Sequence, residues 1–467
     1  MPILAHINET GGNDLARRDA TIRLLVQCLT NNPDPLGIAL NPPSPRRAAP
    51  AFGALRAPVF RRWFVSQVLS ASGTMTQAVA QSWLMLKLTG SGVDLGLLGS
   101  CTMLPMLLGG PLAGAMADRV DRRRLLVVTQ SVFILLAGTL AVLTLTGSIR
   151  VWMLFVLGLA TGTVAAPDAA ARQVFVLDLV GGERLGSAVS LNEVVLNLSR
   201  VAGPAIGGLF LATLGVGACF IANAASYLPP LAVLLGLHRA RGAPPAGVAA
   251  RQPAQRRGAV RAGLRYAWRS PEIRSLLLMA AASGMLFNLG VGLPLLATRT
   301  LHLGGGGYGL LMAAFGMGGV AGALVASSRR PVPRGRAVRR LAAATGIAIL
   351  ATAGAPDVPL AFAGMAATGC LSIWFIAQAN TLAQLRADPS MRGRVMGIWG
   401  MALPGTTPVT GPLVGLTAQT AGPRAGFGLA GAALLLSAAL GWQSLSAGGT
   451  TAAGAHPQPA AGAATTT

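Results

Sequence analysis

Residues Gly109 to Arg124, GGPLAGAMADRVDRRR, decide the fold of this chain. The stretch follows one long apolar segment and leads into another, and it carries Asp118, Arg119 and then three arginines at 122–124. An apolar segment of about 20 residues is long enough to cross a bilayer. The stretch therefore predicts a tight hairpin between two membrane-spanning helices, with its arginines on one side of the membrane.

The composition places the rest of the chain in the same class. Of its 467 residues, 52% are hydrophobic and only 11% are charged, and the mean hydropathy is +0.59. A soluble domain has about 25% charged residues. The net charge of +23 would suit nucleic acid, but the basic residues gather in alternate loops, which is typical of a membrane protein. We therefore expect no nucleic-acid partner, and we expect anionic lipid headgroups beside the basic loops.

The apolar segments predict an all-α membrane protein with twelve transmembrane helices in two six-helix bundles. The predicted spans are 60–86, 93–117, 124–146, 151–171, 187–210, 213–237, 274–298, 306–327, 340–355, 358–382, 395–417 and 423–445. One alternate set of hydrophilic stretches holds 32 Lys and Arg residues, and the other set holds four. This asymmetry predicts an even number of spans and places both termini in the cytoplasm.

The hydrophilic stretches also predict the division of the chain. Both ends are polar or low in complexity, and the middle is basic and rich in Pro and Gly. We expect a disordered cytoplasmic tail over 1–57 and a first six-helix bundle over 58–237. A basic cytoplasmic linker is expected over 238–272, a second six-helix bundle over 273–445 and a second disordered tail over 446–467. Within the linker, 259–269 suits an amphipathic helix on the membrane surface. A start codon assigned too far upstream is an alternative to the first tail, and peptide mapping would decide it.

The two bundles are expected to be related by pseudo-symmetry. Gly203 and Pro204 in the fifth span match Gly411 and Pro412 in the eleventh at an offset of 208 residues. Parallel repeats are one architecture of transporters, in which the substrate binds between the halves near the middle of the membrane. The repeat therefore argues against a channel made from a single bundle and against a membrane enzyme.

The hairpin resembles the loop between the second and third spans of the major facilitator superfamily of secondary transporters. The residues that carry the resemblance are Gly110, Gly114, Asp118, Arg119, Arg122 and Arg123. A carboxylate just past the second span is stabilised near a helix N-terminus, and arginines can pair with carboxylates or cap helix C-termini. We expect these residues to form a gating latch between helices that separate during transport. The alternative is that the arginines only set the topology.

The latch predicts the effect of one conservative substitution. Asp118→Asn removes the charge that a simple topology signal would not need, so it should lower transport more than it lowers expression. Measuring flux and protein amount in the same membranes checks this. Equal transport per molecule would leave the arginines with a topological role only.

The fifth span carries ionisable residues at membrane depth. Glu193, Asn197 and Arg200 share one helical face. Such residues are costly in a bilayer and usually face a water-filled cavity. Glu193 is therefore a candidate proton-carrying or cation-binding group, and Arg200 a candidate cavity residue. The alternative for Glu193 is that it lies near the cytoplasmic end and only reaches toward the interface.

Glycine and proline follow in the same span. Gly203, Pro204, Gly207 and Gly208 would bend the helix and let a partner approach, and Gly411 with Pro412 would do so in the eleventh span. The pattern resembles the fifth-span motif of proton-coupled drug antiporters, and that resemblance implies export.

Other polar residues in the spans are candidate substrate contacts. These are Gln77, Gln81, Asn288, Gln378 and Asn380. The resemblance implies that spans 1, 4, 7 and 10 line the central cavity. The alternative is hydrogen bonding between helices, which contributes about 0.6 kcal/mol each. Pro167 and Asp168 are interpreted as the end of the fourth span.

Residues 58 to 445 resemble one branch of the superfamily, the transmembrane secretion effector group that includes the enterobactin exporter. The resemblance rests on 88–98, 117–124, 171–175 and 184–208. It implies a monomeric proton antiporter of the bacterial inner membrane that exports a small amphipathic molecule, such as a drug, a siderophore or a secondary metabolite. We expect no enzymatic activity, no cofactor and no metal. The expected energy source is the proton gradient. The fourth span lacks the mid-span Arg of many drug antiporters, which argues against proton coupling. An importer and a non-transporting sensor are the alternatives.

Overall fold

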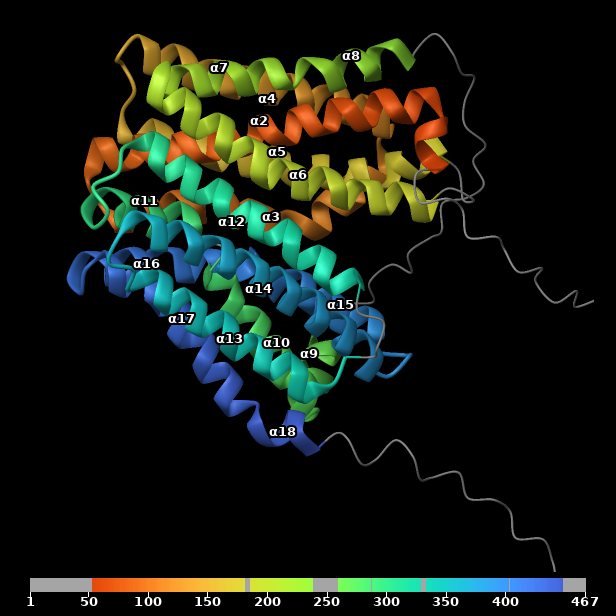
Figure 1. The fold of residues 1–467 in the computed structure, drawn as a ribbon. Helices are drawn as coiled ribbons and strands as arrows, with labels where there is room; N and C mark the ends of the chain where they lie inside the picture. The colour runs from red at the N-terminus through yellow and green to blue at the C-terminus, as the bar shows by residue number, and fades with distance from the viewer. Residues whose placement is uncertain are drawn as a thin grey trace, which may run out of the picture. The chain divides into compact units, whose positions relative to one another are not determined.

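The computed structural model describes residues 53–180, 185–237, 259–286, 288–328, 333–402 and 404–447, and these are almost entirely helical (Figure 1). The first half begins with a 3₁₀ turn and continues through the predicted spans 60–86 to 213–237, the last of which is divided between two helices. Its elements are η1 (Gly53–Arg56), α2 (Pro58–Thr89), α3 (Gly92–Arg119), α4 (Arg122–Leu145), α5 (Val151–Val180), α6 (Leu185–Thr213), α7 (Val216–Ser226) and α8 (Leu228–Gly236).

The second half repeats this series after a short basic helix. Its elements are α9 (Ala259–Arg269), α10 (Pro271–Leu286), α11 (Leu289–Arg299), α12 (Gly305–Ser328), α13 (Gly335–Ala353), α14 (Val358–Arg386), α15 (Arg392–Ala402), η4 (Pro404–Thr406), α16 (Thr407–Thr420), α17 (Pro423–Leu440) and α18 (Trp442–Ala447). Helix α9 covers the stretch expected to be amphipathic. The predicted seventh and eleventh spans are each divided into two helices.

Short capped turns connect the first helices. Gly90 has φ +63°, a left-handed conformation that glycine adopts at little cost, and its N–H bonds the carbonyl of Leu86. Ser91 then accepts a hydrogen bond from the N–H of Asp94 at the start of α3. At the other end of α3, Asp121 accepts from the N–H of Arg124 and caps α4. These caps fix both turns that flank α3.

Proline accounts for two of the helix breaks. It does not account for the bend of 44° between α10 and α11, since Pro294 lies inside α11. Proline lacks an N–H, which favours a helix break at Leu228–Pro230 after α7 and at Pro404 before α16. Pro167, in contrast, lies inside α5, which continues to Val180. The prediction that Pro167 and Asp168 end the fourth span is therefore wrong, because packed membrane helices tolerate proline.

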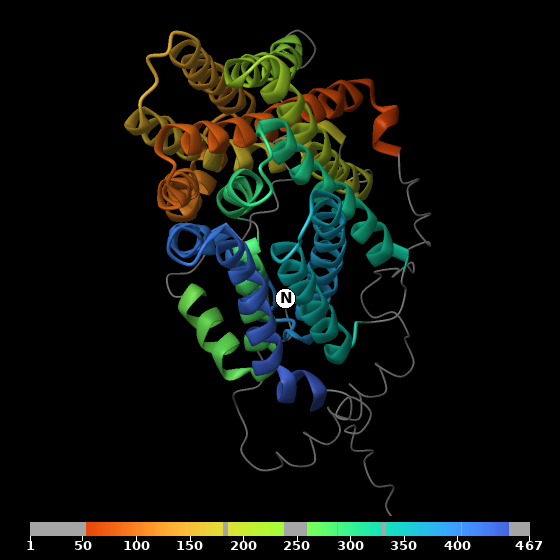
Figure 2. The same ribbon diagram turned by 60° about the vertical axis from the view of Figure 1, so that its left-hand side comes forward.

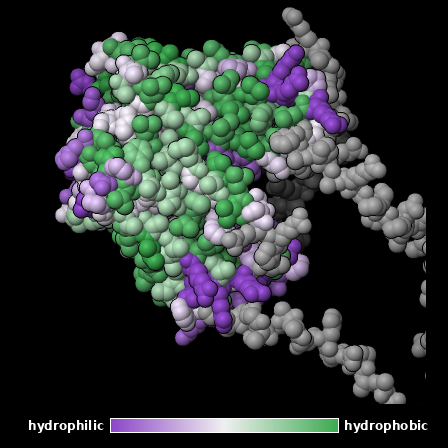
Figure 3. All heavy atoms as spheres, in the orientation of Figure 1, coloured by the Kyte–Doolittle hydropathy of each residue, from purple (hydrophilic) through white to green (hydrophobic). Residues whose placement is uncertain are grey.

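The chain is a multi-pass membrane protein. Among the described residues, eight helices are long and apolar enough to cross a membrane, or nine if α10 and α11 form one bent span. The prediction of twelve adds α2, α13 and the pair α15–α16. Figure 3 shows one face of the molecule, on which hydrophobic residues cover the middle and hydrophilic residues gather toward the edges. That distribution suits a bilayer around the middle.

The helices form two groups that meet along four of their members. Figures 1 and 2 both show α2–α8, red to yellow-green, on one side and α9–α18, green to blue, on the other. The extensive contacts between the groups join α3 to α16 and α6 to α12. One apolar core cluster spans both groups, since Leu95 and Leu98 of α3 share it with Leu295 of α11 and Val414 of α16.

Some predicted regions lie at the limits of the described residues. Most of the predicted N-terminal tail, residues 238–258 of the linker and residues 448–467 lie outside them. The last residues of the predicted tail include η1 (Gly53–Arg56). The N–H of Ala54 in η1 donates to Ser187 Oγ at 3.1 Å, and the side chain of Ala54 is buried. The described residues thus include η1, before residue 58, and η1 packs on α6.

Candidate functional site

A cavity of about 560 Å³ lies between the two halves. Six helices contribute its walls, namely α2, α3 and α6 of the first half and α11 (with its N-cap Asn288), α14 and α16 of the second. The lining residues are Ala78, Gln81, Ser82, Leu95, Leu98, Gly99, Thr102, Met103, Arg200, Asn288, Gly290, Val291, Ile373, Ile376 and Thr407. A volume of about 300–1,000 Å³ and a mostly apolar wall with a few polar groups are typical of sites for small molecules.

Arg200 is the charged member of the cavity wall, and the helix crossing of α6 and α12 holds it there. Pro204 has no N–H, so the carbonyl of Arg200, four residues earlier, loses its intrahelical partner. Gly316 of α12 packs against this carbonyl, since a Cβ built on Gly316 would lie 2.4 Å from the Arg200 oxygen. A larger residue at 316 would push the two helices apart.

Farther from Arg200 along α6 and α12, glycines allow the two helices to pack closely. A Cβ built on Gly309 would lie 2.3 Å from the Cα of Gly208, and one built on Gly208 would lie 2.9 Å from the carbonyl oxygen of Gly306. Next to them, Trp83 of α2 stacks on Tyr308 of α12 with ring centroids 6.2 Å apart. Backbones therefore touch here, which only glycine permits.

The crossing of α3 and α16 is built in the same way. A Cβ built on Gly96 would lie 2.4 Å from the carbonyl of Gly411, and one built on Gly415 would lie 2.0 Å from that of Gly92. Pro412 leaves the carbonyl of Pro408 without its helical partner, and Ser100 Oγ donates to it at 3.0 Å. Both proline-glycine motifs thus face a helix of the other half.

These contacts gather at one end of the molecule, which we call the sparsely charged end. It contains the turn at Gly90–Ser91 and the turn at Ala421–Gly422. Arg299 donates to the carbonyl of Gly90 at 2.6 Å, and Gln419 Nε2 donates to Ser91 Oγ at 2.8 Å. The opposite end, with the hairpin at Val120–Asp121, we call the arginine-rich end.

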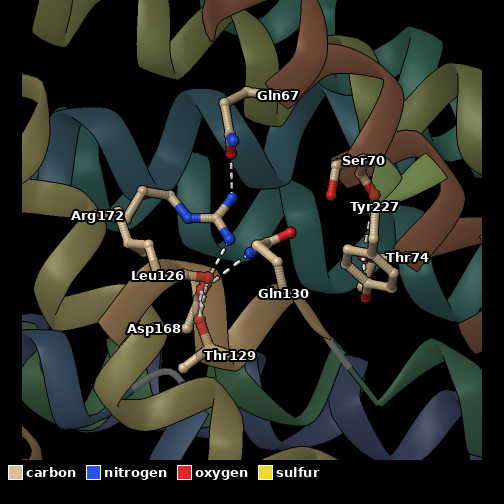
Figure 4. A network of polar contacts seen from close by, with 9 residues as sticks. All are labelled: Gln67, Ser70, Thr74, Leu126, Thr129, Gln130, Asp168, Arg172 and Tyr227. Atoms are coloured by element: carbon tan, nitrogen blue, oxygen red, sulfur yellow. Dashed lines mark hydrogen bonds and ion pairs between the residues drawn. The ribbon is translucent and has the colours of Figure 1, made fainter. Parts of the chain in front are cut away.

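A second polar cluster lies inside the first half and contains a buried ion pair (Figure 4). Asp168 of α5 is 4% exposed, and its carboxylate pairs with Arg172 one turn later. Thr129 Oγ1 and Gln130 Nε2 of α4 donate to the same carboxylate at 2.7 and 3.0 Å. Arg172 also donates to Gln67 of α2. The cluster joins α2, α4 and α5, and a carboxylate held this way at membrane depth is a candidate proton site.

Two buried polar atoms of this cluster form no hydrogen bond with the described residues. Gln67 Nε2 and Gln130 Oε1 are buried and have no hydrogen-bond partner among the described residues. Unpaired buried polar atoms are costly and uncommon. Here the unused groups are the amide NH₂ of Gln67 and the amide oxygen of Gln130. Sequence reasoning missed the cluster, although the spacing of Asp168 and Arg172 by four residues is a signal for an ion pair on one helical face.

Two arginines of the hairpin, Arg122 and Arg123, contact other helices of the first half. Arg122 pairs with Asp178 of α5 at 3.0 Å, and Arg123 Nε donates to the carbonyl of Leu234 near the end of α8 at 2.6 Å. Arg119 is exposed. Asp118 lies in the last turn of α3 rather than past the helix, and Asp121 rather than Asp118 caps α4. The side chain of Asp118, with Gly110 and Gly114, lies outside the described residues.

The three predicted residues of the fifth span do not form one contact set. Glu193 is exposed, and Asn197 Nδ2 donates to the backbone carbonyl of Glu193 at 2.8 Å. Only Arg200 lines the cavity. Gly203 and Gly207 pack on α2, where Thr76 Oγ1 donates to the carbonyl of Gly203 at 2.8 Å.

The predicted substrate contacts divide into two groups. Gln81 and Asn288 line the cavity, and Asn288 Nδ2 also donates to Thr410 Oγ1 at 2.8 Å. Gln77 is buried and accepts from Asn223 of α7 at 2.7 Å, an interaction between helices of the first half. Asn380 accepts from Gln384 on its own helix, and Gln378 is partly buried on α14 outside the cavity lining.

Known proteins share this architecture and sequence pattern. Residues 49–455 match the family described as transmembrane secretion effector. The chain is 29% identical to the multidrug efflux pump Tap of Mycolicibacterium fortuitum over 80% of this chain and 92% of that protein. It is 27% identical to the enterobactin exporter EntS of Citrobacter koseri over 82% of this chain and 92% of that protein.

A solved structure agrees at the level of the fold. The crystal structure of a bacterial homologue of the human lysosomal transporter Spinster superposes with a TM-score of 0.66 at 15% identity, over 84% of this chain and 97% of that one. Among the described residues, no group of His, Cys, Asp and Glu is placed to hold a metal ion. The chain belongs to the transmembrane secretion effector family of the major facilitator superfamily, and it is a membrane transporter rather than an enzyme.

Proposed function

We propose that this protein is a secondary active exporter, which carries a small amphipathic molecule out of the cell by alternating access in exchange for protons. The observation that carries the proposal is the cavity between the two halves, with the close helix crossings gathered at one end. A cavity at the boundary of two repeats is where alternating-access carriers bind substrate. The names of the efflux and exporter relatives favour the outward direction.

The charge distribution supplies the orientation. We assign the arginine-rich end to the cytoplasm by the positive-inside rule, and with it both termini. We also propose that the membrane is the bacterial inner membrane, which the bacterial efflux and exporter relatives favour. The glycine crossings then close the cavity toward the outside. This is the state in which an exporter would load substrate from the cytoplasm or the inner leaflet.

Asp168 is the residue proposed to couple export to the proton gradient. When Asp168 is protonated it loses its charge, so Arg172 loses its counter-ion and the ion pair is weakened. The carbonyl oxygen of the Asp168 carboxyl group still accepts from Thr129 and Gln130. Helix α2 accepts from Arg172 at Gln67 and lines the cavity at Ala78 and Gln81. A rigid helix that touches both sites can transmit the change. Glu193, exposed on α6, is the rival proton carrier.

The hairpin latch keeps its proposed role in a restricted form. Arg122 and Arg123 tie α4 to α5 and α8 of the same half. They therefore brace the first half as one rigid body, so that it can rotate against the second. Asp118 is proposed to engage the second half when the arginine-rich end closes.

Inside-out membrane vesicles test the function directly. An amphipathic fluorescent drug should accumulate in vesicles that contain the protein when respiration energises them, and an uncoupler should abolish the accumulation. Vesicles from cells without the protein are the control. Accumulation only in right-side-out vesicles would indicate an importer, and no flux of a broad compound panel would indicate a sensor. Either outcome contradicts the proposal.

A further inference from the structure

We propose that the central cavity is selective for amphipathic organic anions, with Arg200 binding the anionic group. This inference rests on the proposed function for its setting and adds the chemical class of the substrate. It is drawn from the charge and the apolar surface of the cavity wall.

Within the described parts of the chain no acid is paired with Arg200, and its side chain is exposed on the cavity wall. Its side chain forms no hydrogen bond and no ion pair with any residue in the described parts of the chain. Glu193, seven residues earlier on α6, is exposed and forms no ion pair with it. An arginine at membrane depth is costly unless it is paired or solvated. A ligand that brings its own negative charge would supply the missing partner.

The rest of the wall contributes no acid. Its polar members are neutral, namely Gln81, Ser82, Thr102, Asn288 and Thr407. A cationic drug would meet Arg200 without a compensating carboxylate, and the cost of that repulsion is high in an apolar cavity. The wall thus excludes cations by charge as well as attracting anions.

The apolar side chains define the other part of the ligand. Leu95, Leu98 and Met103 of α3 face the same space as Val291 of α11 and Ile373 and Ile376 of α14. A wall of this kind stabilises an aromatic or aliphatic body. The fitting molecule therefore has one carboxylate, phenolate, sulfonate or phosphate group at one end and an apolar body of drug size. A phospholipid headgroup with its chains shares this chemistry.

Equilibrium binding of two probes that differ only in charge separates the contribution of the anionic group to affinity from that of the apolar body. The purified full chain in phosphatidylcholine nanodiscs is titrated with N-dansyl-phenylalanine, an anion, and with its methyl ester, which has the same body without the charge. Empty nanodiscs are subtracted. A charged hydrogen-bonded contact predicts about 10- to 100-fold tighter binding of the acid. Arg200→Gln should bring the two affinities together, Arg200→Lys should keep a preference for the acid, and Arg150→Gln, an exposed arginine in a turn, should change nothing.

Each outcome decides the proposal. Equal affinity of acid and ester for the wild type overturns it even if Arg200→Gln fails to fold, and so does an acid preference that survives in a folded Arg200→Gln. Loss of acid binding when phosphatidylglycerol is added to the nanodiscs assigns the site to a lipid headgroup and overturns a soluble substrate. If the protein binds the acid selectively but transports nothing in vesicles, the proposed function is wrong and this inference stands. If it transports cations and shows no selectivity for anions, this inference is wrong and the proposed function stands.

Discussion

Asp168→Asn should lower proton-driven export by about 5- to 150-fold, the usual range of coupling between two sites. The substitution keeps an acceptor oxygen for Thr129 and Gln130 but fixes the side chain in a neutral state. If Asp168 carries the proton, the variant can no longer alternate between a charged and a neutral cluster. Substrate exchange down its own gradient should continue, because the cavity residues are unchanged.

The measurement is uptake in inside-out vesicles with and without a proton gradient, and two variants serve as controls. Asp178→Asn removes an acid from the same helix and loosens its partly exposed pair with Arg122. Total transport can fall, but the ratio of uptake with the proton gradient to uptake without it should stay nearly unchanged. Glu193→Gln tests the rival carrier. Loss of the gradient-driven component in Glu193→Gln, with normal coupling in Asp168→Asn, would assign the proton to α6.

Folding is controlled by removing both charges of the pair. Breaking a buried pair on one side leaves an unpaired charge at a cost of about 3–5 kcal/mol, so Asp168→Asn alone can lower the amount of folded protein. The double variant Asp168→Asn with Arg172→Gln carries no unpaired charge. It should restore thermal stability without restoring coupling, and recovery of coupling would show that Asp168 acts only through structure.

Gly309→Ala should hold the sparsely charged end open and shift the equilibrium between the two states about 5- to 150-fold toward the outward-open form, since overpacking costs about 1–3 kcal/mol. Its new Cβ would lie 2.3 Å from the Cα of Gly208, and backbone atoms cannot move aside as a flexible side chain can. Transport should fall because the carrier no longer returns efficiently to the loading state. Accessibility of cysteines placed in the cavity to a membrane-impermeant reagent from outside reports the shift.

Gly96→Ala and Gly138→Ala complete this test. The first places a methyl group 2.4 Å from the backbone of Gly411 at the other crossing and should act in the same direction. The second lies mid-helix in α4 with no atom within 4 Å of the built Cβ, so it should be neutral or slightly stabilising. Unchanged accessibility in Gly309→Ala would show that the two helices do not separate during transport.

Much of the fold follows from hydrophobic segment length and from the alternation of basic loops. Both are properties of the bilayer rather than of particular contacts, which is why the order of spans could be predicted. The exact helix limits could not. Helix α5 passes Pro167 and ends at Val180, because neighbouring helices stabilise a segment whose own sequence favours a break.

The two sites were predictable to different degrees. Arg200, Gln81 and Asn288 were singled out because charged and amide side chains are rare in spans, and the structure places all three on the cavity wall. The cluster around Asp168 was missed because its partners lie 38 or more residues away on α2 and α4. One sequence shows the i, i+4 spacing to Arg172, but it does not show which helices will enclose the pair.

Alternating access requires the two halves to rotate about the central cavity, and distances between pairs of spin labels measure that rotation. With the native cysteines replaced, one label pair at Ser91 and Gln419 spans the sparsely charged end, where these side chains are 2.8 Å apart. A second pair at the exposed Arg119 and Arg392 spans the arginine-rich end. Both distances are measured by double electron–electron resonance, first without additions and then with a transported substrate and low external pH. The additions should lengthen the first distance and shorten the second. Two distances that stay fixed, or that change in the same direction, would contradict alternating access.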